Sequence, residues 1–380
     1  MGLTDIHIAG YRSIRTIRFP VRQLSVLVGA NGVGKTNLYR GLELVQSAAT
    51  GTLAEDIARE GGLGSVFWAG QRKAGEQPRL TLSVTLDDVG FGQASYDLEM
   101  GFAPSYAVEI GFRAPATAAF PLEAQIKAES LTLAGRRPVA LMERKGVSAW
   151  ARDGEGRRVE AEENLLASET ALSALRGYPE IDAVRETLSA WRFFHGFRTD
   201  AESRLRQPAL AVTAPLLAAD GSNLAAVFAT LRHIREDSVD LDAAIEDAFP
   251  GARLDVPMPE QTARFSLTFP DLPHRPFGAT ELSDGTLHYL ALMGALLSYR
   301  LPPLIALNEP ETSLHPQLLP ALARLIARAA ERTQVWVVTH SRILADALAE
   351  EAGIQPREVI RKDGGTWLDG LSQVGIFADD

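Results

Sequence analysis

The spacing of hydrophobic and polar residues changes along the chain, and each pattern predicts a different kind of structure. Short apolar runs near the start predict strands at residues 6–8, 14–19 and 24–28. The last run, LSVLV, is rich in branched residues and is typical of a central strand. A glycine-rich turn at 29–34 follows, and a helix with one apolar face is predicted from Lys35 onward. Strand, turn and helix in this order indicate an α/β unit.

Between Arg79 and Trp150 apolar and polar residues alternate, which is typical of an antiparallel sheet with one face in water. Glycine and proline separate the alternating segments, which predict strands at 80–86, 96–100, 106–112 and 122–133. The charged, glycine-containing segment 152–163 is predicted to be an exposed loop.

A helical period follows, with helices predicted at 183–194, 222–237 and 241–249 and with Ser222 as an N-cap. After a proline-rich connection, strands are predicted at 303–308 and 335–339, and helices after Pro316 and Ser341. The longest apolar stretch, Tyr289–Leu297, is too short to span a bilayer and predicts a buried helix. The last hundred residues thus return to α/β alternation.

The strongest chemical signal is GANGVGKT at 29–36, which fits the GxxxxGK[ST] pattern in full. Its glycines allow backbone N–H groups to surround phosphate oxygens at the start of a helix. Lys35 is expected to reach the β- and γ-phosphates, and the Thr36 hydroxyl to bind Mg²⁺. A turn that only connects strand to helix is the alternative, but the flanking strand, the helix and the Lys-Thr pair favour phosphate binding.

A second signal is LIALNEPE at 304–311, an apolar strand that ends in amide and acidic groups. Phosphate chemistry requires a group that holds the Mg²⁺ shell and a base that orients the attacking water. Asn308 is in the position for the first role and Glu309 in the position for the second. If this motif stood alone, a solvated acidic strand end would be the better interpretation.

Two weaker motifs follow strands or precede helices. In TELSDGT, Ser283 and Gly285 are expected to form a helix N-terminus that donates hydrogen bonds to an anion, although ordinary cap chemistry gives the same pattern. In VVTHS, His340 is a candidate contact for a γ-phosphate. The alternative for His340 is a partly buried histidine with satisfied hydrogen bonds, followed by Ser341 as an N-cap.

Taken in order, these motifs resemble the heads of ABC-class ATPases, and within that class the RecF/SMC-like group. The resemblance is greatest to compact bacterial predicted ATPases of the AAA type that lack a coiled coil. It depends on HIAGYRSI at 7–14, on NEPETSLHP at 308–316 and on the long gap between the P-loop and the signature LSDGT. In this comparison 312–315 is the D-loop.

The resemblance implies the roles of individual residues. Phosphate and Mg²⁺ would be held by the loop that begins at Gly29, through Asn31, Gly32, Gly34, Lys35 and Thr36. Glu309 looks like the catalytic base, His340 like the γ-phosphate sensor, and Ser283 like a group that acts on the ATP of a partner copy. Gln71 is the candidate Q-loop glutamine for nucleotide and metal. Arg12 is a candidate nucleotide contact, although an exposed arginine is the commoner case. Because Asn308 replaces the usual aspartate, turnover is expected to be slow.

The fold that the resemblance implies is an α/β P-loop NTPase fold, an ABC-type head with a mixed sheet, an antiparallel β lobe and an inserted helical lobe. The expected segments are 1–78 for the N-terminal part of the core, 79–160 for the β lobe, 161–275 for the helical insert and 276–380 for the rest of the core.

Composition narrows the choice of partners. The net charge is −10, so any DNA site would have to be a local patch. Candidate patches, which are more commonly solvated faces, are Arg12, Arg15, Arg18 and Arg22, and Arg198, Arg204 and Arg206. The chain has no cysteine, which excludes disulfides and thiolate chemistry. The first residues do not resemble a signal peptide, so we expect a cytoplasmic protein without a membrane partner.

The resemblance implies an ATPase that dimerises around ATP and Mg²⁺ and acts as a switch in DNA repair, DNA maintenance or phage defence. The alternative is an ATP-gated scaffold that hardly hydrolyses and controls a partner protein such as a nuclease. A transporter subunit is disfavoured by the long insert, and a small-molecule kinase by the signature and D-loop. A nuclease in the same chain is disfavoured by the short stretch after His340.

Overall fold

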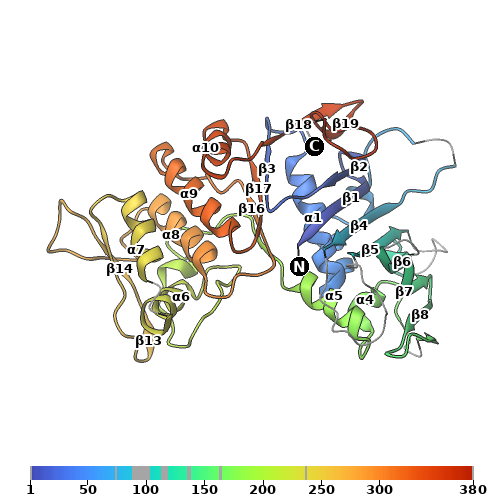
Figure 1. Ribbon diagram of the computed structural model, residues 1–380, viewed down its shortest axis with the longest axis horizontal. Coiled ribbons are helices and arrows are strands. Elements are labelled where there is room, and N and C mark those ends of the chain that lie inside the picture. Colours follow the sequence, from blue (N-terminus) through green and yellow to red (C-terminus); the bar gives the residue numbers. More distant parts are fainter. Residues whose placement is uncertain are drawn as a thin grey trace. The chain divides into compact units, whose positions relative to one another are not determined.

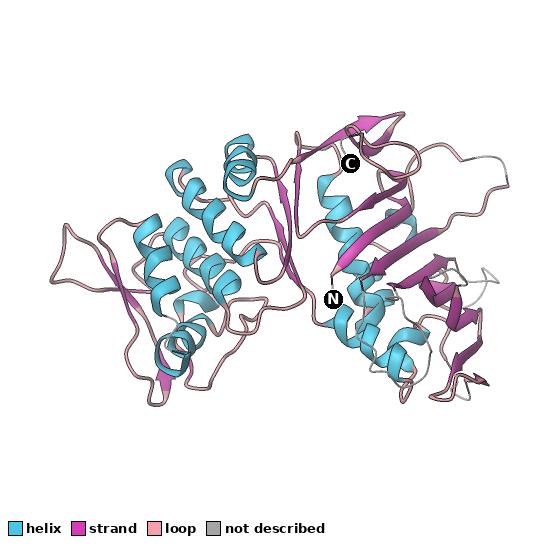
Figure 2. Cartoon of the chain, viewed as in Figure 1, coloured by secondary structure: helices cyan, strands magenta, loops and turns pink. Residues whose placement is uncertain are grey.

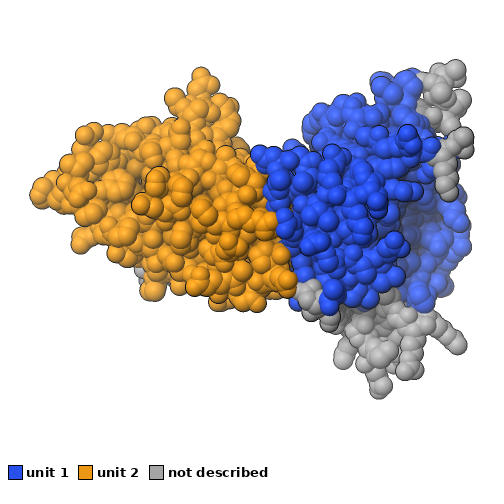
Figure 3. All heavy atoms as spheres, turned by 90° about the horizontal axis from the view of Figure 1, so that it is seen from above, with its two compact units in different colours: residues 1–22, 29–191, 357–380 blue, residues 23–28, 192–356 orange. Residues whose placement is uncertain are grey.

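The computed structural model describes residues 2–72, 75–87, 103–112, 119–134, 138–161, 165–235 and 238–378. Figure 1 shows the chain coloured by sequence, and Figure 2 shows its helices and strands. The chain forms two compact units, coloured separately in Figure 3. Unit 1 comprises 1–22, 29–191 and 357–380, and unit 2 comprises 23–28 and 192–356. The strand predicted at 96–100 lies outside the described residues.

Unit 1 is built on an antiparallel sheet with the order β2-β1-β4-β5-β6-β7-β8-β9. Its strands are β1 (Leu3–Tyr11), β2 (Ile14–Pro20), β4 (Leu80–Leu86), β5 (Ala103–Gly111), β6 (Gln125–Ala134), β7 (Val139–Lys145), β8 (Ser148–Arg152) and β9 (Arg158–Glu160). Burial alternates along β4, which confirms the period-two prediction there. Strands β1 and β2 thus share a sheet with the strands of the predicted β lobe. The loop predicted at 152–163 is wrong in part, because β9 lies inside it.

The helices of unit 1 are α1 (Lys35–Thr50), α2 (Leu53–Arg59), α3 (Leu63–Val66), α4 (Ala171–Ala174) and α5 (Pro179–Ser189). The predicted apolar face of α1 is confirmed, since Leu38, Leu42 and Val45 are fully buried. Helix α1 packs against β1, β4 and α5. The C-terminal hairpin, β18 (Arg357–Lys362) and β19 (Gly365–Leu368), contacts β2.

Unit 2 contains a parallel sheet with the order β10-β16-β17-β3. The strands are β10 (Arg192–Phe194), β16 (Leu304–Asn308), β17 (Gln334–Thr339) and β3 (Leu24–Val28). Every residue of β17 is buried, as expected for a central strand of a parallel sheet. Because the strands are parallel, their carboxyl ends lie at one edge of the sheet. The candidate residues of unit 2 described below lie at this edge.

The helices of unit 2 lie on one side of this sheet (Figure 1). They are α6 (Leu224–Thr230), α7 (Ser238–Ala248), α8 (Asp284–Leu297), α9 (Leu319–Ala330) and α10 (Arg342–Ala352), with the short helical turns η1 (Arg204–Arg206), η2 (Leu231–Arg235) and η3 (Pro316–Leu318). Short strand pairs complete the unit: β11 (Ala209–Leu210) with β13 (Thr262–Ala263), and β14 (Ser266–Thr268) with β12 (Arg253–Asp255) and β15 (Phe277–Gly278). None of the described helices is long and apolar enough to cross a membrane. The buried helix predicted at Tyr289–Leu297 is confirmed as part of α8.

Two helix predictions in this region are wrong at their ends. The helix predicted at 183–194 stops at Ser189, and Arg192–Phe194 form β10, which pairs with β16. Ser222 does not cap the next helix. Asn223 is the cap residue there, and its amide accepts a hydrogen bond from Ala218 N (2.8 Å).

Candidate functional site

The P-loop follows the carboxyl end of β3 and leads into α1. Lys35 is buried and its Nζ donates to the carbonyl oxygens of Gly29 (2.7 Å) and Ala30 (2.8 Å). Thr36 is exposed, as are the loop residues Asn31 and Gly32. The lysine is therefore held against its own loop, while the groups predicted to meet a phosphate are open to solvent.

Two side chains from distant parts of the sequence support this loop within unit 1. Thr366 of β19 donates its hydroxyl to Val33 O (2.8 Å) and lies 2.6 Å from the Ser13 hydroxyl. Asn37 of α1 donates to the same Ser13 oxygen (2.6 Å). Gly34 has a φ of 103°, and a Cβ there would lie 1.9 Å from Thr366 Oγ1. Only glycine fits this position, for reasons of both conformation and space.

The sequence analysis gave no role to Ser13 or Thr366. Ser13 lies in the HIAGYRSI segment that carried the family resemblance, so a signal for it existed. Nothing near Thr366 in the sequence marks it, because its contacts are made across the whole length of the chain.

A second group of candidate residues lies at the acidic edge of the sheet in unit 2. Asn308 ends β16, and Glu309 N donates to Val338 O of β17 (2.7 Å). Glu309 has a φ of 50°, a left-handed conformation that is costly for a residue with a side chain and that often marks functional positions. His340 Nδ1 lies 3.7 Å from Glu309 Oε2. The predicted base and the predicted sensor are therefore neighbours at this edge.

Glu311 organises the turn after β17. Its Oε1 accepts hydrogen bonds from the Thr339 hydroxyl (2.5 Å), His340 N (3.0 Å) and Ser341 N (3.2 Å). His340 Nδ1 lies 3.1 Å from the same oxygen. The carboxylate is only 6% exposed, whereas His340 is 44% exposed. The sequence analysis quoted Glu311 within its motif but assigned it no role.

His340 is 44% exposed and its Nδ1 has Glu311 Oε1 as a partner at 3.1 Å, so its contact with a γ-phosphate stays a prediction beside the alternative of a partly buried histidine with a satisfied hydrogen bond. Ser341, in contrast, does cap α10, because its hydroxyl accepts from Leu344 N (3.2 Å). The cap and an exposed imidazole coexist at this turn.

The signature segment begins α8. Ser283 is exposed and caps the helix, accepting from Thr286 N (3.1 Å). A Cβ on Gly285 would lie 2.7 Å from Ser313 O of the D-loop, so a glycine is needed for this close approach. His288 Nε2 donates to Pro310 O (3.1 Å), and burial lowers the pKa of His288. The signature helix and the segment after β16 are thus packed together within unit 2.

The residues fit a Mg²⁺ ion that is shared with phosphate oxygens. Asn308 Oδ1 is buried and has no hydrogen-bond partner among the described residues. An amide oxygen is a suitable acceptor for a metal-bound water. Within the described parts of the chain there is no cluster of three or more acidic or histidine side chains that could hold a metal unaided. A metal here would depend on nucleotide oxygens for part of its coordination.

Arg12 and Gln71 lie in one region of unit 1. Arg12 Nη2 is 2.8 Å from Glu60 Oε2, and the side chain is partly exposed. Arg12 O accepts from Ala69 N (2.9 Å), two residues before the exposed Gln71. The nucleotide roles of both residues remain predictions.

The arginines proposed as DNA patches are mostly paired with carboxylates. The pairs are Arg12 with Glu60, Arg18 with Asp5, Arg198 with Asp200, Arg204 with Asp220, and Arg206 with Asp284. Arg15 stacks over the Trp68 ring. Arg206 is only 10% exposed, so its inclusion in a surface patch is wrong.

The family is identified from the sequence of the second half of the chain. Residues 155–346, just over half of the protein, match the family described as "AAA domain, putative AbiEii toxin, Type IV TA system". The chain belongs to this AAA-domain family. The matched residues of the AAA-domain family contain Ser283, Asn308, Glu309 and His340, while the P-loop lies before them. A comparison with curated protein sequences finds no match.

Comparison with solved structures shows which known folds this AAA-domain protein resembles. It is similar to the Smc head bound to the C-winged helix domain of ScpA, with 14% identity and a TM-score of 0.57, over 98% of this chain and 99% of that one. It is also similar to the Smc head domain with an extended coiled coil bound to the C-terminal domain of ScpA derived from Pyrococcus furiosus. That match has 11% identity and a TM-score of 0.51, over 98% and 96% of the two chains. The predicted fold class, a P-loop NTPase fold of the ABC-type head, is confirmed.

Proposed function

We propose that the protein binds Mg²⁺ and ATP at its P-loop and hydrolyses the ATP slowly. The observation that carries this proposal is the sheet edge of unit 2. Glu309 and His340 adjoin each other at the carboxyl ends of β16 and β17, and β3 of the same sheet runs directly into the P-loop. Phosphoryl transfer to water requires a phosphate-binding loop and a base that orients the water, and the chain offers a candidate for each.

Each side chain has a separate task in this proposal. Lys35 would leave the loop carbonyls to bind the β- and γ-phosphates, and Thr36 and Asn308 would hold Mg²⁺ and its water. Bound Mg²⁺ would offset the phosphate charge. Glu309 orients the attacking water and accepts its proton, and His340 contacts the γ-phosphate. Gln71 and Arg12 are proposed as further contacts to the metal shell and the nucleotide.

Two copies of the chain are proposed to close around ATP. Ser283 is exposed at the N-terminus of α8, where backbone N–H groups favour an anion. Acting on the nucleotide of a second copy, Ser283 would complete the site only in the dimer. Glu309→Gln, which blocks hydrolysis, should then give a dimer by mass measurement in ATP, and a strict monomer would contradict the proposal.

Steady-state hydrolysis is the direct test of the activity. The wild-type protein should release phosphate slowly, and Lys35→Ala and Glu309→Gln should each reduce the release to background. Glu309→Gln should still bind ATP, whereas Lys35→Ala should not. Turnover unchanged by Glu309→Gln would overturn the assignment of the base. Adding duplex or single-stranded DNA tests a role in DNA repair, maintenance or phage defence.

A gated scaffold is the second candidate, and Asn308 is the observation that favours it. An amide in place of a carboxylate removes one charge from the metal shell and slows hydrolysis more than it weakens binding. The two Smc heads similar in fold are each bound to a part of ScpA, and the family description names a toxin–antitoxin system, so a protein partner is a reasonable proposal for this chain. Tight ATP binding with almost no turnover would favour the scaffold.

A further inference from the structure

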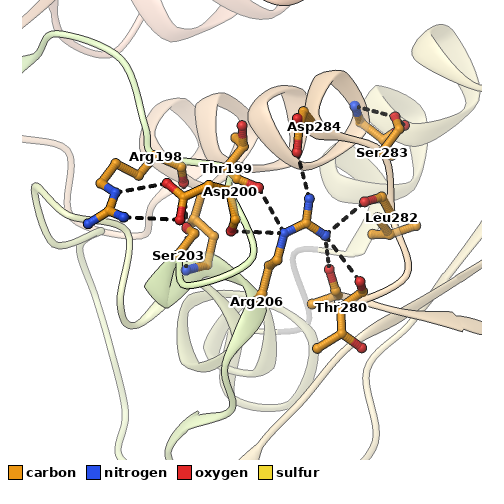
Figure 4. Close-up of polar contacts among 12 residues, drawn as sticks. Arg198, Thr199, Asp200, Ser203, Arg206, Thr280, Leu282, Ser283 and Asp284 are labelled. Atoms are coloured by element: carbon orange, nitrogen blue, oxygen red, sulfur yellow. Dashed lines mark hydrogen bonds and ion pairs between the residues drawn. The ribbon is translucent and has the colours of Figure 1, made fainter.

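Arg206 connects two segments of unit 2 that are far apart in the sequence. Its Nε donates to the carbonyl oxygens of Thr199 (2.8 Å) and Asp200 (3.2 Å). On the other side it binds the residues just before and at the start of α8. Nη1 donates to the carbonyls of Ala279 (3.0 Å), Thr280 (3.3 Å) and Leu282 (2.8 Å), and Nη2 to Asp284 Oδ1 (2.7 Å). Figure 4 shows the guanidinium between these two groups of acceptors.

The two segments join the sheet edge to the signature. Residues 195–206 continue from β10, which lies beside β16. Residues 279–283 lead into α8 and end at the cap residue Ser283. Phe197 of the first segment also packs against the His288 ring of α8, at a centroid distance of 6.0 Å. The guanidinium therefore lies where the start of the signature helix is fixed to the rest of unit 2.

Ordinary helix stabilisation does not account for this arginine. A positive charge near a helix N-terminus is unfavourable, because the helix dipole is positive there. What the guanidinium offers is a planar set of N–H donors that can bind several fixed acceptors at once. Three of these acceptors are carbonyls of the turn immediately before Ser283. Lysine, with one nitrogen, could not reach both segments in this way.

We propose that Arg206 is the positioning residue for the signature. It fixes the backbone of 279–282, so that Ser283 and the first N–H groups of α8 face the nucleotide held by a second copy of the chain. This inference rests on the proposed ATP-dependent dimer. Arg206→Ala should lower the turnover number by about tenfold to a hundredfold, the size of effect that a misplaced catalytic geometry produces. Binding of ATP by the P-loop of the same chain should stay within a factor of about two.

Mixing variants tests whether the defect belongs to the signature. In an equal mixture of Lys35→Ala and Ser283→Arg chains, half of the dimers are mixed and each has one intact site, so about a quarter of wild-type activity should return. Arg206→Ala mixed with Lys35→Ala should recover activity in the same way. Arg206→Ala mixed with Ser283→Arg should not, because both chains then carry an impaired signature.

A general loss of structure would give a different result. It would damage Glu309 as well, which works with the P-loop of its own chain, so mixing with Lys35→Ala would restore nothing. Arg232→Ala is the matched control, since Arg232 is also a largely buried arginine of unit 2, bound to Asp242 and to Leu254 O. It should lower thermal stability without lowering turnover. Arg206→Lys should recover only a part of the lost activity.

The outcomes separate this inference from the proposed function. If Lys35→Ala and Ser283→Arg do not complement each other, the dimer with a shared site is wrong, and the role of Arg206 is refuted with it. If they complement but Arg206→Ala and Lys35→Ala do not, the shared site stands and the positioning role alone is refuted. Wild-type turnover in Arg206→Ala would also refute it.

Discussion

Replacing Glu311 by alanine removes the acceptor that holds the turn after β17. Thr339 Oγ1 and His340 N would then lose their carboxylate partner, while Ser341 N keeps the Thr339 hydroxyl at 2.9 Å. Two hydrogen bonds to a charged group, at about 1.5 kcal/mol or more each, predict a loss of about 3 kcal/mol in the free energy of unfolding. For a protein unit of this size, that corresponds to a midpoint lowered by about 6–12 °C.

Calorimetry of the full chain is the assay, with two variants for comparison. Glu309→Ala makes the same truncation two residues away at a more exposed side chain, 33% exposed, and should change stability by less than about 0.5 kcal/mol. Glu311→Gln retains an oxygen that can accept the same hydrogen bonds. It should therefore cost less than Glu311→Ala.

Measuring ATP turnover should also distinguish the Glu309→Ala variant from the Glu311→Ala variant. Glu309→Ala removes the proposed base and should abolish hydrolysis in a stable protein. Glu311→Ala should reduce both stability and turnover, because the backbone of His340 is no longer fixed. If Glu311→Ala unfolds at the same temperature as Glu309→Ala, then this carboxylate does not hold the turn, and its role as described here is wrong.

Three further changes have defined outcomes. Gly34→Ala would place a Cβ 1.9 Å from Thr366 Oγ1 and should weaken ATP binding at least about tenfold. Adding Thr366→Ala removes the clashing hydroxyl, so titration with ATP should show part of the affinity restored in the double variant. Asn308→Asp should raise turnover in Mg²⁺ and lower the melting temperature without nucleotide, and an unchanged rate would show that this position does not limit hydrolysis. Burial lowers the pKa of His288, so the folded protein loses stability as the pH falls below about 6.5, where the unfolded histidine takes up a proton. His288→Gln, which can still donate to Pro310 O, should show a smaller loss between pH 7.5 and 5.5 in thermal unfolding.

The local patterns predicted the buried strands and the P-loop helix, because each of them depends on the spacing of neighbouring residues. The end of the helix predicted at 183–194 failed for a related reason. A segment as short as RFF at 192–194 has no period that distinguishes a helix from a strand. It becomes β10 because β16 lies beside it, and that pairing joins residues more than a hundred positions apart.

The residues of the candidate site also divide into those that a local motif predicts and those that no local motif marks. Motif spacing predicted Lys35, Glu309 and His340 as site residues, since phosphate chemistry needs such groups after strands. It could not identify Arg206 or Thr366, whose partners are distant in the sequence. Arg206 even suggested a surface patch for DNA, because a row of arginines does not show which of them are buried.

Burial separates the residues proposed to do chemistry from the residues that hold them. Ser283 and His340 are exposed and Glu309 is a third exposed, as groups that meet a nucleotide must be. Beside them, the side chains of Arg206 and Glu311 are only 10% and 6% exposed and bind mainly backbone atoms of the neighbouring turns. Substitutions in the first group should therefore remove activity without unfolding the protein. Substitutions in the second group should affect activity only by moving the residues of the first group. Loss of activity alone therefore does not distinguish the two groups, and complementation between copies of the chain is needed.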